Sequence, residues 1–212
     1  YEASVQAEIS SGADASLLLP EPANARTVIT VGAYVSRTSW PALSSFQPEA
    51  DTVGDISDFS SPGPTRDGRQ KPEITAPGEY IVSSYSAFSD PRPASYQIAD
   101  DSVHRAWKGT SMSAPHVTGT AALMLEADPT LSSSRIKSYL MTTAIKDEFT
   151  PTASWSARWG YGKLDTYAAV EKARPTAVPG ERQAAPGPRL YHPFPNPFST
   201  ETVLSFSLTT SS

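Results

Sequence analysis

A serine at the start of an apolar helix is the feature of this sequence that most directly suggests chemistry. Ser111 follows a Gly-Thr turn and precedes a run of small and apolar residues that ends at Asp128-Pro129. The run predicts a buried helix of about four turns, and Pro115 falls early enough in it that its missing N–H costs little. Unpaired N–H groups and the positive end of the helix dipole stabilise an oxyanion that forms beside the hydroxyl. The position suits a nucleophile, although a serine there can also be an ordinary helix cap.

A serine nucleophile needs a base, and the sequence offers no obvious one. The base is normally a histidine that a buried aspartate orients. The three histidines are His104, His116 and His192. His116 lies on the serine's own helix and is interpreted as a packing residue, whereas His104 falls in a polar loop and His192 in the C-terminal tail. None of them is expected to act as the base.

Composition narrows the class of protein. The chain has 212 residues, a net charge of −5 and no cysteine, so neither disulfides nor thiolate metal sites are possible. Without a basic patch, nucleic acid is not an expected partner. No apolar run approaches the roughly 18–20 residues of a membrane span. The chain starts at Tyr1 without a methionine or a signal peptide, which suggests part of a longer protein.

The pattern of the remaining chain predicts alternating strands and helices. Strands are expected at 2–9, 27–33 and 80–85, with loops at 36–54 and 86–107. The run at 27–33 is apolar and β-branched throughout, as in a central strand of a parallel sheet.

Two further helices are expected after the serine helix. One begins at Ser132, whose side chain is a suitable N-cap, and it places Ile136, Tyr139 and Leu140 on one face. The other covers 166–173 behind Asp165, which is interpreted as a cap and not as a catalytic residue.

Several segments resemble the subtilases, the subtilisin-like serine peptidases. The stretch 109–117, Gly-Thr-Ser-Met-Ser-Ala-Pro-His-Val, matches their active-site serine segment at nearly every position. The segments 22–33, 58–65, 71–78 and 159–165 also resemble the family, with Ala23 in place of a glycine and Pro62 in place of an arginine. The resemblance implies an α/β, three-layer parallel-sheet subtilisin-like fold, present in part, with a short β tail. It also implies that Ser111 is the nucleophile, and it makes Glu21-Pro22 a candidate cis peptide bond.

The resemblance covers the C-terminal part of a subtilase catalytic domain. The family's Asp-(Ser/Thr)-Gly turn, His-Gly-Thr-His segment and Ala-Gly-Asn segment are absent, and neither Asn24 nor Asn196 has the context of the oxyanion asparagine. The implied parent is a serine endopeptidase that forms an acyl-enzyme on Ser111, whereas the chain alone is expected to be inactive. Two alternatives remain open: a pseudo-peptidase that uses the scaffold for binding, and a cell-surface structural or adhesion protein.

The C-terminal tail has a different composition. Prolines crowd the segment 175–189, as in an extended linker, and Phe194-Pro195-Asn196-Pro197-Phe198 precedes an alternating strand around Phe206. This pattern resembles the start of a C-terminal sorting domain of the type IX secretion system, although a generic proline-rich linker into another β module is the alternative. The resemblance implies the secretion machinery as a partner and a secreted or cell-surface location.

The expected organisation has four parts. Residues 1–19 are a possible end of a β-rich insertion, 20–174 the catalytic part, 175–189 the linker, and 190–212 a truncated β-sandwich sorting domain. The expected partners are protein or peptide substrates. No cofactor or metal site follows from the sequence, and structural calcium in the parent protein is implied only by the resemblance.

Overall fold

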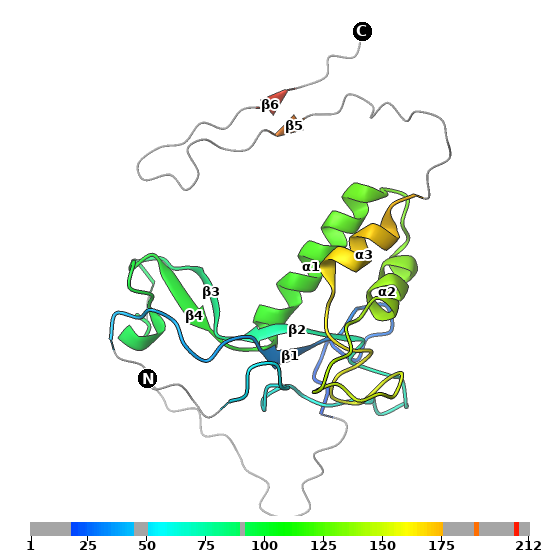
Figure 1. The fold of residues 1–212 in the computed structure, drawn as a ribbon, viewed down its shortest axis with the longest axis horizontal. Coiled ribbons are helices and arrows are strands. Elements are labelled where there is room, and N and C mark those ends of the chain that lie inside the picture. Colours follow the sequence, from blue (N-terminus) through cyan, green and yellow to red (C-terminus); the bar gives the residue numbers. More distant parts are fainter. Residues whose placement is uncertain (1–17, 45–50, 90–91, 176–188, 191–205, 208–212) are drawn as a thin grey trace, which may run out of the picture. The chain divides into compact units, whose positions relative to one another are not determined.

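The computed structural model describes residues 18–44, 51–89 and 92–175, together with the backbone of 189–190 and 206–207 (Figure 1). The chain divides into two units, Tyr1–Pro175 and Thr176–Ser212. The division falls close to the expected end of the catalytic part at 174. The strand expected at 2–9 and most of the tail lie outside the described residues.

Two parallel strands form the centre of the first unit. Strand β1 (Val31–Val35) pairs with β2 (Ile74–Glu79) in a register that places Val31 opposite Ile74. Strand β1 begins later than the expected run at 27–33, and two backbone groups that precede it bond to side chains. The Val28 carbonyl accepts a hydrogen bond from the Lys71 ammonium, and the Thr30 N–H donates to the Glu73 carboxylate.

The three helices lie close to their expected positions. Helix α1 (Thr110–Ala127) contains Ser111, α2 is Ser133–Thr142, and α3 is Thr166–Ala173. Both expected caps are confirmed, because the Ser132 hydroxyl accepts from an N–H in the first turn of α2 at 3.3 Å and the Asp165 carboxylate does the same for α3 at 2.8 Å. The Glu21–Pro22 bond is cis, as expected; Gly63–Pro64 and Lys71–Pro72 are also cis.

The hydrophobic core lies between the parallel strands and the helices. Helix α1 packs on both strands, α3 packs on α1, and α2 packs on α3. Small residues such as Ala76 and Ala169 let these elements approach closely. The buried cluster comprises Ile74, Ala76, Val117, Met124, Leu131, Ile136, Leu140, Ala169 and Ala173. This parallel sheet with its helical layer confirms the α/β class, and the described residues contain no second helical layer.

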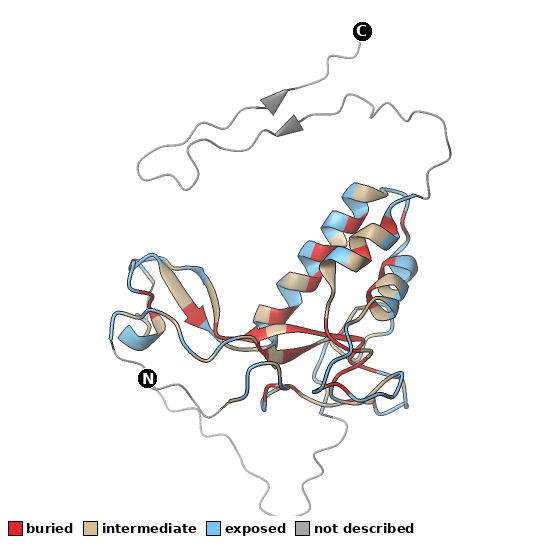
Figure 2. Cartoon of the chain, in the orientation of Figure 1, coloured by how far each residue is buried: buried red, intermediate tan, exposed pale blue. Residues whose placement is uncertain are grey.

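Helix α1 is buried on one face only, contrary to the expectation of a buried helix. Figure 2 shows buried and exposed residues alternating along it. The exposed face includes Ala114, Gly119, Leu123 and Leu125, and the two leucines are 46% and 39% exposed. A helix that is apolar on nearly all sides is normally buried on all sides, so this face is short of packing partners among the described residues.

The polar segment expected as a loop at 86–107 carries structure of its own. It contains a 3₁₀ turn, η1 (Ser95–Gln97), and strand β4 (His104–Trp107), which pairs antiparallel with β3 (Ile81–Ser84). The loop prediction was therefore wrong for its last residues. The motif at 71–78, read as turn chemistry, likewise contains most of β2. Strands β2 and β4 each pair with a segment that is distant in sequence. Local turn residues do not reveal such a pairing.

The second unit contains one described pair of short strands. Strand β5 (Arg189–Leu190) pairs antiparallel with β6 (Phe206–Ser207). Strand β6 lies within the alternating strand that the sequence predicts. The Phe194–Phe198 motif lies outside the described residues.

Candidate active site

Ser111 is the second residue of α1, and its side chain is exposed. No side chain caps the helix, because the N-cap is Gly109, and the first turn has no acidic residue. The described residues provide neither the hydroxyl nor the N–H of Ser111 with a hydrogen-bond partner. A developing oxyanion beside the hydroxyl would therefore meet a free N–H and the positive end of the helix dipole.

The end of β2 holds the serine turn in place. The Gly109 N–H donates to the Gly78 carbonyl at 2.8 Å, and the Met112 N–H donates to the Gly109 carbonyl at 2.9 Å. Gly109 has a φ of 146°, which disfavours any residue with a side chain. Ser111 consequently lies near the carboxyl end of the parallel strands, where ligands bind in open α/β sheets.

Gly78 leaves room for the first turn of α1. A Cβ added at Gly78 would lie 2.1 Å from the Ser113 hydroxyl and 2.5 Å from the Ala33 Cβ. Ser113 is fully buried, and its hydroxyl has no hydrogen-bond partner among the described residues. The absence of a side chain at position 78 thus fixes the distance between β2 and the helix that carries the serine.

Gly78→Ala is expected to reduce both stability and any activity at Ser111. Overpacking of this kind destabilises by about 1–3 kcal/mol, and a displacement of a reacting group by about 1 Å lowers the rate about 100-fold. Urea unfolding measures the first effect, and the rate at which Ser111 of the natural protein reacts with a serine-directed reagent measures the second. The double variant Gly78→Ala/Ser113→Ala should recover part of both, because it removes one of the two overlapping atoms. Unchanged unfolding of the single variant would contradict the packing argument.

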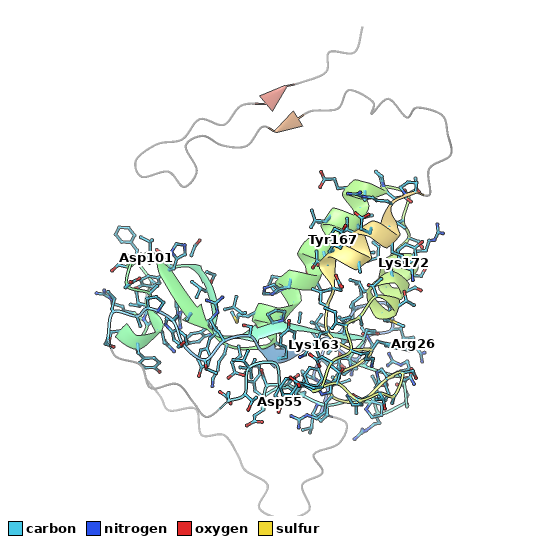
Figure 3. All side chains as sticks on the ribbon, in the orientation of Figure 1. Arg26, Asp55, Asp101, Lys163, Tyr167 and Lys172 are labelled. Atoms are coloured by element: carbon cyan, nitrogen blue, oxygen red, sulfur yellow. The ribbon has the colours of Figure 1, made fainter. Side chains whose placement is uncertain are left out.

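The other polar residues considered from the sequence lie in different environments. The His116 Nδ1–H donates to the Met112 carbonyl at 2.8 Å within α1, in line with a packing role. His104 pairs with Asp101 at 2.5 Å, and Figure 3 places Asp101 at the outer end of the β3–β4 hairpin. Trp107, the residue of β4 nearest to Ser111 in sequence, lies at the opposite end of that strand. Asn24 donates to Glu21 within its own turn at 2.8 Å. The geometry therefore brings none of these groups to Ser111.

The described residues contain neither a candidate metal site nor a candidate membrane span. No group of three or more His, Cys, Asp or Glu side chains in this part of the chain is arranged to hold a metal ion. No helix in it is long and apolar enough to cross a membrane.

Sequence reasoning missed a pocket that lies next to the serine turn. Its volume is about 230 Å³, and its walls include Trp40, Tyr80, Tyr96, Trp107 and Lys108. The sequence held one signal of this pocket, because Trp107 and Lys108 directly precede the Gly-Thr-Ser turn. The other walls come from distant segments, so the pocket exists only in the folded chain.

Comparison with known proteins assigns the family. The model of the subtilase family matches residues 6–162, most of the chain. The chain therefore belongs to the subtilase family. The match includes much of the segment 1–19, which the sequence assigned to a possible insertion. Family membership agrees with the serine segment at 109–117 and with the partial subtilisin-like fold.

Individual relatives give the same assignment over shorter stretches. This subtilase is 37% identical over 130 residues to the uncharacterized protein aq_aa18 of Aquifex aeolicus (strain VF5). The match covers 60% of this chain and 54% of that protein. It is 41% identical over 112 residues to the subtilisin-like protease SBT4.13 of Arabidopsis thaliana, over 50% of this chain and 14% of that protein.

A solved structure shows the same architecture. The Clostridium perfringens CspB protease matches 74% of this chain with a TM-score of 0.54 and 28% identity, and the match covers 29% of that chain. The chain therefore spans about half of the Aquifex protein and smaller shares of the two proteases.

Proposed function

We propose that this subtilase is the C-terminal part of a serine endopeptidase in which Ser111 is the nucleophile. The observation that carries the proposal is the position of Ser111, exposed at the uncapped N-terminus of α1 beside the end of β2. The family assignment supports it, since the chain carries the family's serine segment.

The reaction assigned to Ser111 has two steps. Its Oγ attacks the carbonyl carbon of the scissile peptide while a histidine takes the hydroxyl proton, and that proton then goes to the leaving amine. Water hydrolyses the resulting ester and restores the serine. In this proposal the N–H of Ser111 serves as one oxyanion donor. Asn24 is not a candidate for the other, because its side chain is engaged in its own turn.

The rest of the catalytic machinery is assigned to polypeptide upstream of this chain. The described residues bring no histidine, aspartate or asparagine side chain to Ser111. The exposed apolar face of α1, with Leu123 and Leu125, is short of packing partners. The relatives and the solved protease that match this chain extend well beyond the matched part. We therefore infer that the upstream part covers this face and supplies the base, its orienting aspartate and the second oxyanion donor.

A fluorophosphonate probe tests this assignment directly. The probe forms a bond between phosphorus and an activated serine Oγ and releases fluoride, so it labels a serine only when a base takes the proton. In the natural protein we expect mass spectrometry to find the adduct on Ser111, with none on Ser113. The 212-residue chain alone should stay unlabelled.

The two contrary outcomes have different meanings. Labelling of the isolated chain at Ser111 would show that its own residues supply the base. A natural protein that folds and stays unlabelled would be a pseudo-peptidase, the alternative that the sequence leaves open. Determining the sequence upstream of Tyr1 would then show whether the aspartate or the histidine is missing.

We also propose that the tail directs export through the type IX secretion system, which gives a secreted or cell-surface location. The proposal rests on the Phe-Pro-Asn-Pro-Phe motif at 194–198 and the alternating residues after it. Deletion from residue 190 onward should retain the protein inside the cell envelope of its host, as fractionation would show. Unchanged export after this deletion would contradict the proposal. Structural calcium in the natural protein stays a prediction.

A further inference from the structure

A sharp bend at Tyr80 separates β2 from β3 beside the serine turn. Tyr80 has a φ of 53°, in the left-handed region that residues with a side chain rarely adopt, and it is buried. Backbone of this kind costs free energy and persists where its surroundings hold it, often at functional sites. The bend lies opposite the serine turn, because the Gly78 carbonyl accepts from the Gly109 N–H and Ile81 pairs with Trp107.

One ion pair joins this bend to the residue that leads into the serine turn. That residue is Lys108, and its ammonium lies 3.4 Å from Oε1 of Glu79. The same ammonium lies 5.3 Å from the centroid of the Tyr80 ring. The main chain at Glu79 is held as well, since its carbonyl accepts from the Ser36 hydroxyl at 2.9 Å. The bend therefore offers Lys108 a fixed carboxylate and a fixed aromatic face.

The two partners differ in their contact with solvent. The Glu79 side chain is 3% exposed, whereas that of Lys108 is 38% exposed. Oε2 of Glu79 has no hydrogen-bond partner among the described residues. A buried pair seldom adds stability relative to apolar residues of the same size, because taking a carboxylate out of water is costly. Stability is thus a weak reason for a charge at position 79, and its action on Lys108 is a better one.

We propose that Glu79 and Lys108 are positioning residues for Ser111. Their ion pair holds the segment before the serine turn against the bend at Tyr80, and it thereby sets where the Ser111 hydroxyl and N–H lie. Neither side chain takes part in the bond changes. For its effect on catalysis the proposal rests on the nucleophile role proposed above, but its geometric part is measurable without catalysis.

Labelling kinetics with the fluorophosphonate probe, measured on the natural protein, test the effect on reactivity. Glu79→Gln removes the charge and keeps the shape, and it should fold because Lys108 can extend into solvent. We expect the maximal labelling rate to fall about 10- to 100-fold, since a displacement of about 1 Å lowers a rate about 100-fold. The probe concentration that gives half of this rate should stay the same. The matched control is Glu171→Gln, which breaks the pair with Arg174 in α3 and should change neither constant.

Variants of Lys108 show whether the two residues act together. Lys108→Met should slow labelling as much as Glu79→Gln, whereas Lys108→Arg keeps the charge and should retain most of the rate. The double variant Glu79→Gln/Lys108→Met should be no slower than Glu79→Gln, because both lose the same interaction. It also leaves no buried charge unpaired, so it decides the question if Lys108→Met does not fold. An unchanged rate in folded Glu79→Gln, or effects that multiply in the double variant, would overturn the proposal.

Hydrogen exchange of the Gly109 amide gives a readout that needs no catalysis. Its N–H donates to the Gly78 carbonyl at 2.8 Å, so it reports how firmly the serine turn is held to β2. In the natural protein, mass spectrometry with single-residue fragmentation should find faster exchange at Gly109 in Glu79→Gln than in the wild type. The Leu164 amide is the internal control and should exchange at the same rate in both, since it donates to the Thr75 carbonyl on β2 at 2.8 Å.

The two readouts separate this proposal from the nucleophile role. Equal acceleration at Gly109 and Leu164 would indicate general destabilisation and would contradict a positioning role. A natural protein that the probe does not label would contradict the nucleophile role, and exchange at Gly109 would still decide whether the ion pair holds the turn.

Discussion

Ser111→Ala is expected to lower kcat for peptide cleavage by the natural protein on the order of 10⁶-fold, as loss of the serine does in the subtilisin triad. The alanine has no atom that can attack the carbonyl, so only uncatalysed attack of water in the bound state remains. KM should change little, because the exposed hydroxyl has no partner among the described residues and contributes little to binding before attack. Cleavage of a peptide containing phenylalanine, followed by chromatography, measures both constants.

The matched control for this variant lies on the same helix. Ser113→Ala removes a hydroxyl only two residues away that is buried and unpartnered among the described residues, so it should keep the activity and raise stability by about 1 kcal/mol. Residual activity of Ser111→Ala above about 1% of wild type would exclude Ser111 as the nucleophile. Thermal unfolding should be the same for Ser111→Ala and the wild type, because the hydroxyl packs against nothing that the removal would disturb.

Glu73→Gln is expected to destabilise the chain by about 3–5 kcal/mol, the usual effect of breaking a buried ion pair. Glu73 is 3% exposed, and its carboxylate pairs with the buried Lys71 ammonium at 3.1 Å and with Lys137 of α2. The Thr30 N–H also donates to this carboxylate at 2.7 Å. A neutral amide leaves two ammonium groups near each other without a counter-charge. Urea unfolding monitored by circular dichroism measures the loss.

The lysines show why this carboxylate cannot be replaced without loss. Burial lowers the pKa of Lys71, with hydrogen bonding to Glu73 opposing that effect, so the charged lysine depends on its partner. Lys71 also donates to the Val28 carbonyl and the Thr30 hydroxyl at 2.9 and 3.0 Å. The cluster thereby ties the segment before β1 to the start of β2 and to α2.

A partly exposed pair of the same type is the control. Glu171 pairs with Arg174 at 3.0 Å, with side chains 39% and 63% exposed. Glu171→Gln should cost less than about 1 kcal/mol, because solvent screens the pair. The double variant Glu73→Gln/Lys71→Met should recover part of the loss by removing one unpaired charge. Equal effects of Glu73→Gln and Glu171→Gln would refute a structural role for the buried cluster.

Local sequence was sufficient for the elements whose signals are local. The run after Ser111 predicted α1, because a helix depends on neighbouring residues and on breakers such as Asp128-Pro129. Ser132 and Asp165 predicted the starts of α2 and α3, since a cap bonds within its own first turn. The serine segment also indicated the subtilase family, to which the match over residues 6–162 assigns the chain.

Only the tertiary structure decided the features that depend on contacts between distant segments. Strand β4 was read as loop because its polar residues show no strand signal, and pairing with β3 supplies the hydrogen bonds that define it. The exposed and the buried face of α1 both carry apolar residues. The composition of the helix therefore could not show which face would be buried.

The pocket and the carboxylate cluster also depend on contacts between distant segments. Trp40 and Trp107 are far apart in sequence, as are Glu73 and Lys137, and neither pair forms a motif. By itself the sequence determined the nucleophile candidate, the helices and their caps, because these rest on interactions between near neighbours in the chain. The walls of the pocket, the burial of the charges and the open face of α1 were set by packing, because burial is a property of how distant segments meet.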